Sequence, residues 1–542
     1  MNLRRKRMIL MRDVWYGYNR TASGNPVTLE AAKRLRQLTI YGNAVQDGTP
    51  SPDAPVEVQL CGDRTGNLLD YDVFDNMPEY TSSSSNIGSF AVPLPNGVYT
   101  ASTNIPLAPY AGMFVASSMP SDKWTTASYG VSAGMPRTVT VTDGVMYIGL
   151  YWRNVYDLAY DHVFTKEDFT TGMYWIMLTT GSEAQPYEPY GYKVSGRVTG
   201  VNLYNVNDKY KTWNTAVTDD AGWITVNYDN TEGTSGNWPS LYTNFRDVIE
   251  PSTEYTIVTE IEYISGCALY PNTTGSPKSA FNILFSYTQQ GTHYMTVTSE
   301  SDLSDCVTLL RSNYLVEPGN IGSAKFRISL LKGSYTADTI PPYEPYQPPQ
   351  DFAVYLPQQI AKVGDVADTV VLDMEKRTAE LRKNVGSVET DCASVVSLND
   401  NRITLQCRNS KLSSGLYQSA EHKEMLNKYF PYIPNSSVDT EGVGPNMVGA
   451  TYQTYVRINK SRIDITEEDT LETLADKCQA FLNTLNEPKT YYVLATPTTT
   501  DISALQDWDA MPQVKGTVTL TLSAEVPPSG AEAVYYSAER GD

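Results

Sequence analysis

Histidine and paired cysteines are scarce in this chain of 542 residues. The 3 histidines, His162, His293 and His422, are too far apart in sequence for an HExxH-type pair of metal ligands. The 6 cysteines are spread over the whole length without a CxxC pair, which argues against a zinc knuckle and against a disulfide framework. We therefore expect reduced cysteines and neither a metal nor another cofactor.

Long apolar runs and extended basic clusters are also missing. The densest apolar run, at 145–152, is broken by glycine and tyrosine and is far shorter than the ~20 residues of a membrane helix. The basic run at 4–7 resembles the start of a signal peptide, but Arg12 and Asp13 interrupt the apolar stretch that follows it. A formal net charge of −20 repels a phosphate backbone. We expect no secretion signal, no membrane insertion and no binding of nucleic acid.

Sequence signatures of catalysis are lacking as well. The chain has no GxSxG elbow, no cysteine with a supporting histidine motif and no glycine loop of the phosphate-binding kind. The short regular repeats of a β-helical depolymerase are absent. With 61 acidic residues, carboxylate pairs are too common to identify a general acid and its partner. We expect that the protein is not an enzyme.

A long internal repeat is the most informative feature that is present. Asn67 opens a stretch that closes with the sequence PYEPY at 186–190, and Asn202 opens another that closes with PYEPY at 342–346. In both stretches a proline stands four residues before a Tyr-Thr pair, and an Ile-x-Leu sequence precedes Gly-Ser. Such repetition indicates two copies of one domain. Because each PYEPY lies at a domain exit, where proline fixes an extended path, we expect it to have a structural role.

The composition favours a mainly β protein whose last part is α+β. The 39 tyrosines, 36 glycines and 32 prolines are typical of short strands joined by turns. After a capping-box-like start at 466–469, apolar residues from Leu471 to Leu485 fall on one helical face, and a shorter helix is expected at 420–429. Residues 517–526 alternate as a half-buried strand.

These patterns divide the chain into four parts. The proline-rich linker at 341–350 marks the last boundary. The expected parts are an N-terminal docking segment at 1–65, β-sandwich modules at 66–196 and 197–346, and a C-terminal α+β domain at 347–542.

The segment LTIYGNAVQDGTPSPDAPV at 38–56 resembles the opening of minor structural tail proteins of phages and prophages that infect Gram-positive bacteria. The Asn-Leu openings, the Gly-Ser approach to YEPY and the stretch 467–499 are similar to the same group, so the resemblance covers most of the chain. It implies a virion protein of the distal tail or baseplate, assembled in the cytoplasm of the host bacterium. It also implies tandem sandwiches of the carbohydrate-binding jelly-roll type.

Two functions remain open for such a protein. In the first, the sandwiches bind glycan on the host cell surface. In the second, the protein is a purely structural baseplate or tail-tip component whose sandwiches bind other tail or baseplate proteins. In either case a symmetric virion predicts a homo-oligomer. A bacterial surface adhesin is disfavoured because no signal peptide or sorting tail is evident.

Aromatic residues are the candidate glycan contacts, because a sugar ring stacks on a flat apolar face while amides and carboxylates bond its hydroxyls. Trp238 is the strongest candidate, since it follows Asn237 after a long polar loop. Trp175, Trp152 and Trp223 lie in apolar strand-like runs that favour core positions. The acidic pair Asp219-Asp220 is expected to form a solvated turn and not a calcium site. The candidate glycan contacts are Trp238, Tyr242, Asn237, Trp213, Trp124 and Tyr129.

Overall fold

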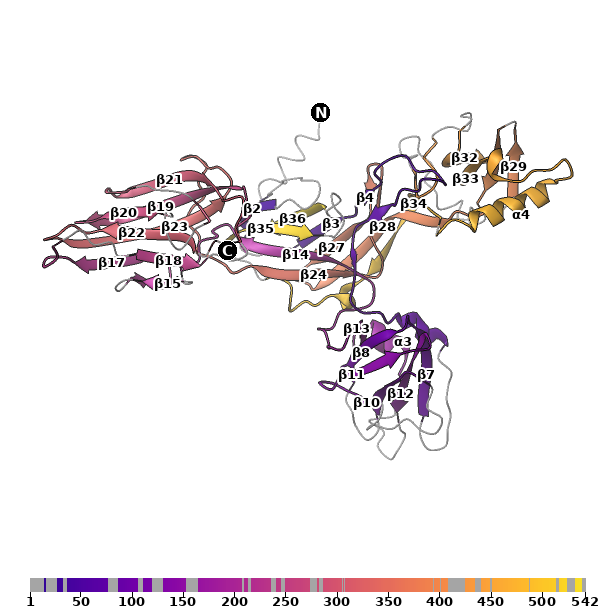
Figure 1. Ribbon diagram of the computed structural model, residues 1–542, viewed down its shortest axis with the longest axis horizontal. Coiled ribbons are helices and arrows are strands. Elements are labelled where there is room, and N and C mark those ends of the chain that lie inside the picture. The colour runs from indigo at the N-terminus through magenta and orange to yellow at the C-terminus, as the bar shows by residue number, and fades with distance from the viewer. Residues whose placement is uncertain are drawn as a thin grey trace.

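The computed structural model is mainly β, with several antiparallel sheets and a curled half-barrel among them. A central body carries three lobes: the second repeat, the first repeat, and a smaller sheet with a helix at the opposite end from the second repeat (Figure 1). The structure describes residues 14–15, 27–32, 37–76, 86–105, 111–118, 130–152, 164–206, 209–212, 216–234, 240–244, 249–272, 280–281, 286–304, 306, 308–392, 394–399, 401–407, 425–433, 440–448, 451–486, 488–512, 516–523 and 532–538.

Strands from distant parts of the chain build the central body. One sheet has the order β1-β36-β3-β27-β28-β34-β31, and the other has the order β2-β35-β14-β24 with β6 also paired to β14. Their bounds are β1 (Val14–Trp15), β36 (Glu532–Ala538), β3 (Gln37–Tyr41), β27 (Thr369–Asp373), β28 (Thr378–Glu389), β34 (Lys489–Asp501), β31 (Met425–Asn427), β2 (Val27–Ala32), β35 (Gly516–Ser523), β14 (Tyr192–Gly200), β24 (Gln350–Leu356) and β6 (Asp63–Arg64).

The two central sheets share one hydrophobic core. Alternation along β3 buries Leu38 and Ile40 completely, and they pack in the same cluster as Val194 of β14 and Val354 of β24. β3 pairs with β27 and β36, which lie far away in sequence. The division into four parts stays a prediction, but β3 lies in one sheet with β27, β28, β34 and β36, and its Leu38 and Ile40 share a core with Val370 and Leu381.

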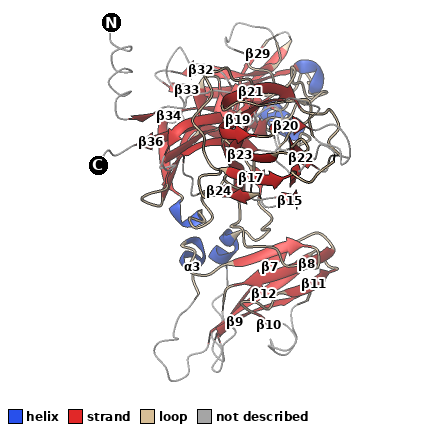
Figure 2. Ribbon diagram, turned by 90° about the vertical axis from the view of Figure 1, so that its left-hand side faces the viewer, coloured by secondary structure: helices blue, strands red, loops and turns tan. Residues whose placement is uncertain are grey.

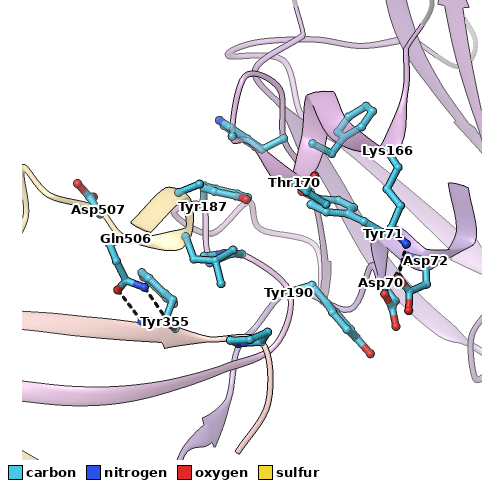
Figure 3. Close-up of a pocket in the computed structure, with 17 residues that line it drawn as sticks. Asp70, Tyr71, Asp72, Lys166, Thr170, Tyr187, Tyr190, Tyr355, Gln506 and Asp507 are labelled. Carbon is cyan, nitrogen blue, oxygen red and sulfur yellow. Dashed lines mark hydrogen bonds and ion pairs between the residues drawn. The ribbon is translucent and has the colours of Figure 1, made fainter. Parts of the chain in front are cut away.

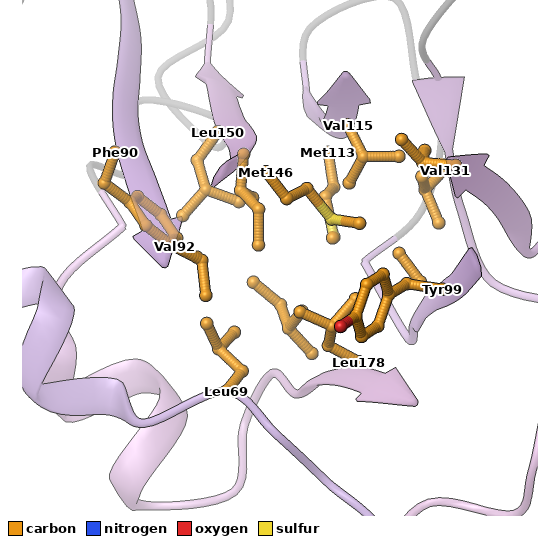
Figure 4. Packing of buried hydrophobic residues seen from close by; sticks show 14 of the residues in the cluster. Leu69, Phe90, Val92, Tyr99, Met113, Val115, Val131, Met146, Leu150 and Leu178 are labelled. Atoms are coloured by element: carbon orange, nitrogen blue, oxygen red, sulfur yellow. The ribbon is translucent and has the colours of Figure 1, made fainter. Parts of the chain in front are cut away.

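The first repeat is a β-sandwich-like pair of sheets with the orders β10-β9-β12-β7 and β11-β8-β13. Its core lies between the sheets, where Met113 and Val115 of one sheet face Tyr99 and Leu178 of the other (Figure 4). Its elements are η1 (Tyr71–Asn76), β7 (Asn86–Pro93), β8 (Gly97–Thr103), β9 (Ala111–Ala116), β10 (Gly130–Val131), β11 (Arg137–Val141), β12 (Val145–Trp152), α3 (Lys166–Thr170) and β13 (Ile176–Thr180). Figure 2 shows the two sheets of this lobe side by side.

The second repeat reproduces this topology. Its sheets have the orders β15-β18-β22-β20 and β16-β17-β23-β19-β21. The series β18-β22-β20 corresponds to β7-β12-β9, and β23-β19-β21 corresponds to β13-β8-β11, so these strands have the same order in both repeats. The bounds are β15 (Lys209–Thr212), β16 (Val217–Thr218), β17 (Ile224–Asp229), β18 (Ser240–Asn244), β19 (Glu254–Ser265), β20 (Ala268–Asn272), β21 (Gly291–Thr298), β22 (Thr308–Leu315) and β23 (Ile321–Lys332).

A buried asparagine clasps the base of each sandwich. Asn67 Nδ2 donates to the carbonyl oxygens of Ile176 and Glu188, and its Oδ1 accepts from the amides of Leu69 and Leu178. Asn202 repeats the arrangement with Ile328, Glu344, Tyr204 and Leu330. Glu188 and Glu344 are the glutamates of the two PYEPY sequences. The motif is thus the exit of each sandwich, tied to its opening residue, which agrees with the structural role expected from the sequence.

The third lobe is a sheet covered by the longest helix among the described residues. The sheet has the order β29-β30-β33-β32, and α4 buries Leu474, Cys478 and Leu482 in the same core as Ile403 of β30. The predicted helix is confirmed, although it begins at Leu471 with Thr470 as its cap, one turn after the expected box. The bounds are β29 (Ser394–Leu398), β30 (Arg402–Gln406), β32 (Gly442–Val448), β33 (Thr451–Asn459) and α4 (Leu471–Leu482); short elements elsewhere are β4 (Ala44–Val45), β5 (Gln59–Leu60), β25 (Lys362–Val363), β26 (Val366–Ala367), η4 (Lys460–Arg462) and η5 (Ser503–Leu505).

The shorter helix expected at 420–429 is wrong in its described part. Residues 425–427 form β31, which pairs with β34, while 420–424 lie outside the described residues. The reason is local: the side chain of buried Asn427 accepts from the amides of Tyr429 and Phe430 and donates to Thr390 and Thr490, so it supplies the bonds of a turn at the end of a strand. All six cysteines are free, as expected.

Candidate functional site

A cleft of about 530 Å³ lies between the first sandwich and the central body (Figure 3). We call it the aromatic cleft, because Trp175, Tyr187, Tyr190 and Tyr355 are among its lining residues. The sandwich contributes η1, α3 and the PYEPY exit, and the central body contributes the end of β24 and the turn at 504–507. Its full lining is Asp70, Tyr71, Asp72, Lys166, Phe169, Thr170, Gly172, Trp175, Tyr187, Pro189, Tyr190, Tyr355, Pro357, Ala504, Leu505, Gln506 and Asp507.

Stacked and hydrogen-bonded rings form the sandwich side of the cleft. The rings of Trp175 and Tyr187 stack with centroids 4.6 Å apart and an interplanar angle of 22°. Tyr71, whose hydroxyl lies 3.2 Å from the carbonyl oxygen of Ile176, is also hydrogen-bonded to Tyr187. Burial raises the pKa of Tyr187, and the neighbouring Tyr71 raises it further. The phenols are therefore neutral at physiological pH and retain their O–H donors.

The side chain of Gln506 fastens the opposite wall. Its Oε1 accepts from the amide of Tyr355 at 3.1 Å, and its Nε2 donates to the carbonyl oxygens of Tyr355 at 2.8 Å and Ile502 at 3.0 Å. These bonds hold the turn at 502–507 against β24. Burial raises the pKa of Tyr355 to about 12, with further contributions from Glu188 and Asp507, so this phenol is neutral too.

Acidic side chains surround one end of the cleft. Lys166 Nζ lies 2.6 Å from Asp72 Oδ1 and 2.8 Å from Asp75 Oδ2, and these bonds raise the pKa of its ammonium group. The lining thus contains the carboxylates of Asp70, Asp72 and Asp507 against one ammonium group, which is already engaged. An anionic ligand would meet net repulsion here.

The equivalent position of the second sandwich holds an arginine. Trp175 directly precedes the Ile-x-Leu sequence of the first repeat, and Arg327 directly precedes that of the second. The guanidinium carbon of Arg327 lies 4.2 Å from the ring centroid of Tyr343 and 4.5 Å from that of Trp223. Arg327 also forms an ion pair with Glu260 at 2.6 Å. The Arg327 side chain thus contacts the tyrosine of its PYEPY motif, as Trp175 contacts Tyr187 in the first sandwich.

The six candidate glycan contacts are not tested by this structure. Trp238, Asn237, Trp213, Trp124 and Tyr129 lie outside the described residues. For Tyr242 only the backbone is described, as part of β18, where it pairs with Arg311 of β22.

Two tryptophans differ from the core positions that the sequence favours. Trp175 is half-buried and lines the aromatic cleft, and Trp223 is half-buried beside Arg327. Sequence reasoning missed Trp175 because it stands next to an apolar strand. The repeat itself holds the missing signal: a position that is tryptophan in one copy and arginine in the other is not a core position.

The acidic pair at 219–220 forms part of a turn, as expected from the sequence. Asp219 Oδ1 accepts from the amides of Ala221 and Trp223, which closes a turn. In the part of the chain that the structure describes, no three side chains of the metal-binding types gather into a site. Within that same part, no helix has the length and apolarity needed to cross a membrane.

Comparison of the sequence with protein families and with curated proteins finds no match. The chemistry of the aromatic cleft therefore rests on its own residues. Flat apolar faces, neutral phenols and unneutralised carboxylates together suit an uncharged ligand that carries many hydroxyl groups.

Proposed function

We propose that this protein is a tail or baseplate component of a phage virion that contributes to recognition of glycan on the host cell surface. The observation that carries the proposal is the duplication of one sandwich on a common body. Both copies are joined to the central body through the same asparagine clasp and PYEPY exit. A repeated attachment of this kind suits a carrier of binding modules.

The proposal also covers the type of sandwich, the oligomeric state and the partners of the protein. Each sandwich is of the jelly-roll type, in which two antiparallel sheets leave loops and one face free for a ligand. The protein assembles in the host cytoplasm into a homo-oligomer that matches the symmetry of the tail. Its other partners are neighbouring tail or baseplate proteins. Support comes from the resemblance of 38–56 and 467–499 to tail proteins and from the separate lobes around the central body (Figure 1).

Two measurements test this function. Gold-labelled antibody to the chain should mark the distal end of the tail in electron micrographs of intact virions. Purified full-length protein should bind cell walls of the host strain and compete with virions for adsorption. A chain that is absent from virions would overturn the proposal.

The alternative function predicts a different combination of results. A purely structural component, whose sandwiches bind other virion proteins, would be present at the tail but would neither bind cell walls nor reduce adsorption. The repeated clasp accommodates this reading too, since a rigid base serves protein contacts equally well. Cell-wall binding is therefore the result that separates the two.

A further inference from the structure

The aromatic cleft combines ring faces with hydrogen-bonding groups from two parts of the protein. Trp175, Tyr187 and Tyr190 come from the first sandwich, and Tyr355 comes from β24 of the central body. Trp175 and Tyr187 stack on each other, so their stack presents an extended apolar surface. Ligand pockets of ~300–1,000 Å³ with mostly apolar walls and a few polar groups are typical of small-molecule sites, and a volume of about 530 Å³ falls in this range.

The polar groups of the cleft suit hydroxyl groups. The hydroxyls of Tyr187 and Tyr355 stay protonated because burial raises the pKa of each phenol. Asp507 Oδ1 accepts a single amide bond, from Ala510, which leaves this exposed carboxylate with acceptor capacity. A sugar hydroxyl donates and accepts at once, so it matches a phenol beside a carboxylate.

The charges of the cleft select against an anion. Asp70, Asp72 and Asp507 line it, and its one ammonium group, on Lys166, is held between Asp72 and Asp75. A sugar carboxylate or a phosphodiester would be repelled by these groups. A neutral sugar would not be repelled by them.

The second sandwich has a different residue at the position of Trp175. There Arg327 lies over the rings of Trp223 and Tyr343 and is neutralised by Glu260, so a cation of the protein covers the tyrosine that a tryptophan covers in the first copy. Both copies keep the first tyrosine of PYEPY, but a different side chain covers its ring in each copy. The first copy therefore presents an aromatic ring at a position where the second has a paired cation.

We propose that the aromatic cleft binds a neutral pyranose of a glycan, with Trp175 as the stacking residue and Asp507 as a hydrogen-bond acceptor. This inference rests on the proposed function and gives it a location. It places the contact at the junction of the first sandwich and the central body.

The test uses full-length protein and ligand-observed NMR with neutral methyl glycosides of glucose, galactose, N-acetylglucosamine and rhamnose. At least one should bind wild-type protein, and methyl β-D-glucuronide, which carries a carboxylate, should bind more weakly. Trp175→Ala should lower the affinity about tenfold or more through loss of the stack. Trp175→Arg, which introduces the residue of the second copy, should abolish binding by filling the cleft. Asp507→Asn should weaken it while leaving the stack in place.

Tyr294→Ala is the matched control, because Tyr294 is an aromatic side chain of the second sandwich that is 44% exposed and lies outside the cleft. This variant should bind like wild type. Equal binding by Trp175→Arg, a preference for the glucuronide, or no binding of any neutral glycoside would each overturn the cleft as the site. If Trp175→Arg still binds host cell walls as wild type does, the proposed function stands and only its location is wrong. If wild-type protein does not bind cell walls, the proposed function itself fails.

Discussion

Asp368 and Lys383 form a buried ion pair in which Asp368 Oδ2 lies 2.5 Å from Lys383 Nζ. The carboxylate is fully buried and also accepts from the amides of Ala361, Asn384 and Val385. Lys383 and Val385 flank an irregularity in the pairing of β28 with β34. One side chain therefore satisfies the amides that this break in the ladder leaves without strand partners.

Replacing Asp368 with asparagine should destabilise the central body strongly. The change leaves the Lys383 ammonium buried without a counter-charge, which costs about 3–5 kcal/mol in comparable pairs. Urea unfolding of the central body measures this loss. Asp509→Asn is the control, since its pair with Arg377 is exposed and such pairs contribute ~0–1 kcal/mol. Equal effects of the two changes would contradict the role of burial.

Removing one asparagine clasp should loosen one sandwich and leave the other intact. Asn67→Ala leaves the amides of Leu69 and Leu178 without their acceptor, and each unsatisfied buried group costs about 1–3 kcal/mol. Hydrogen exchange should accelerate at 176–180 and stay unchanged at 328–332. Asn202→Ala should give the reverse pattern. Acceleration in both copies from a single change would show that the clasps are not independent.

The side chain of Arg462 should be required to hold the loop at 47–55. Its Nη1 and Nη2 donate to the two carboxylate oxygens of Asp53 at 2.9 and 2.8 Å, and its Nε donates to Glu441. Arg462→Ala should accelerate hydrogen exchange at 47–55, because the loop loses the two bonds to Asp53. Arg462→Lys, which keeps the charge without the planar fork, should rescue only part of this effect. Unchanged exchange in the loop would refute the prediction.

Acid should remove a stabilising contribution of Asp469. Bonds from Lys477, from the amide of Thr466 and from Thr473 lower the pKa of this carboxyl to about 2. Because the folded value lies below the ordinary one of 3.8, the contribution is present above that value and is lost as the pH falls toward 2. The difference in urea midpoint between wild type and Asp469→Asn should therefore shrink between pH 5 and pH 2. A difference that stays constant over this range would rule out the carboxylate as its source.

The repeat and the main helix could be predicted from sequence because their signals are local. Asn67 and Asn202 open both copies, and α4 has an apolar face with a threonine cap. The central body could not be predicted in this way. Alternation in β3 indicates that Leu38 and Ile40 face a core, but it does not say that β27 and β36 are the neighbours.

The aromatic cleft was missed for a related reason. Its two walls, the sandwich with Trp175 and the turn with Gln506, are distant in sequence and meet only after the first sandwich has docked on the central body. No periodicity within either segment carries that information. Only the contrast between Trp175 and Arg327 across the two copies marks the position, and it shows divergence without naming a ligand.

The central body pairs strands from distant parts of the chain, and this affects the order in which the protein folds during synthesis on the ribosome. β3 lies between β27 and β36, so its first strand partner is complete only at residue 373 and its second only at residue 538. At ~5–20 residues per second this delay is on the order of tens of seconds, long enough for both sandwiches to fold first. We expect stalled chains that end at 346 to hold two protease-resistant sandwiches and a protease-sensitive segment at 37–41. Protease resistance of that segment in such chains would mean that β3 pairs temporarily with another segment before its final partners are made.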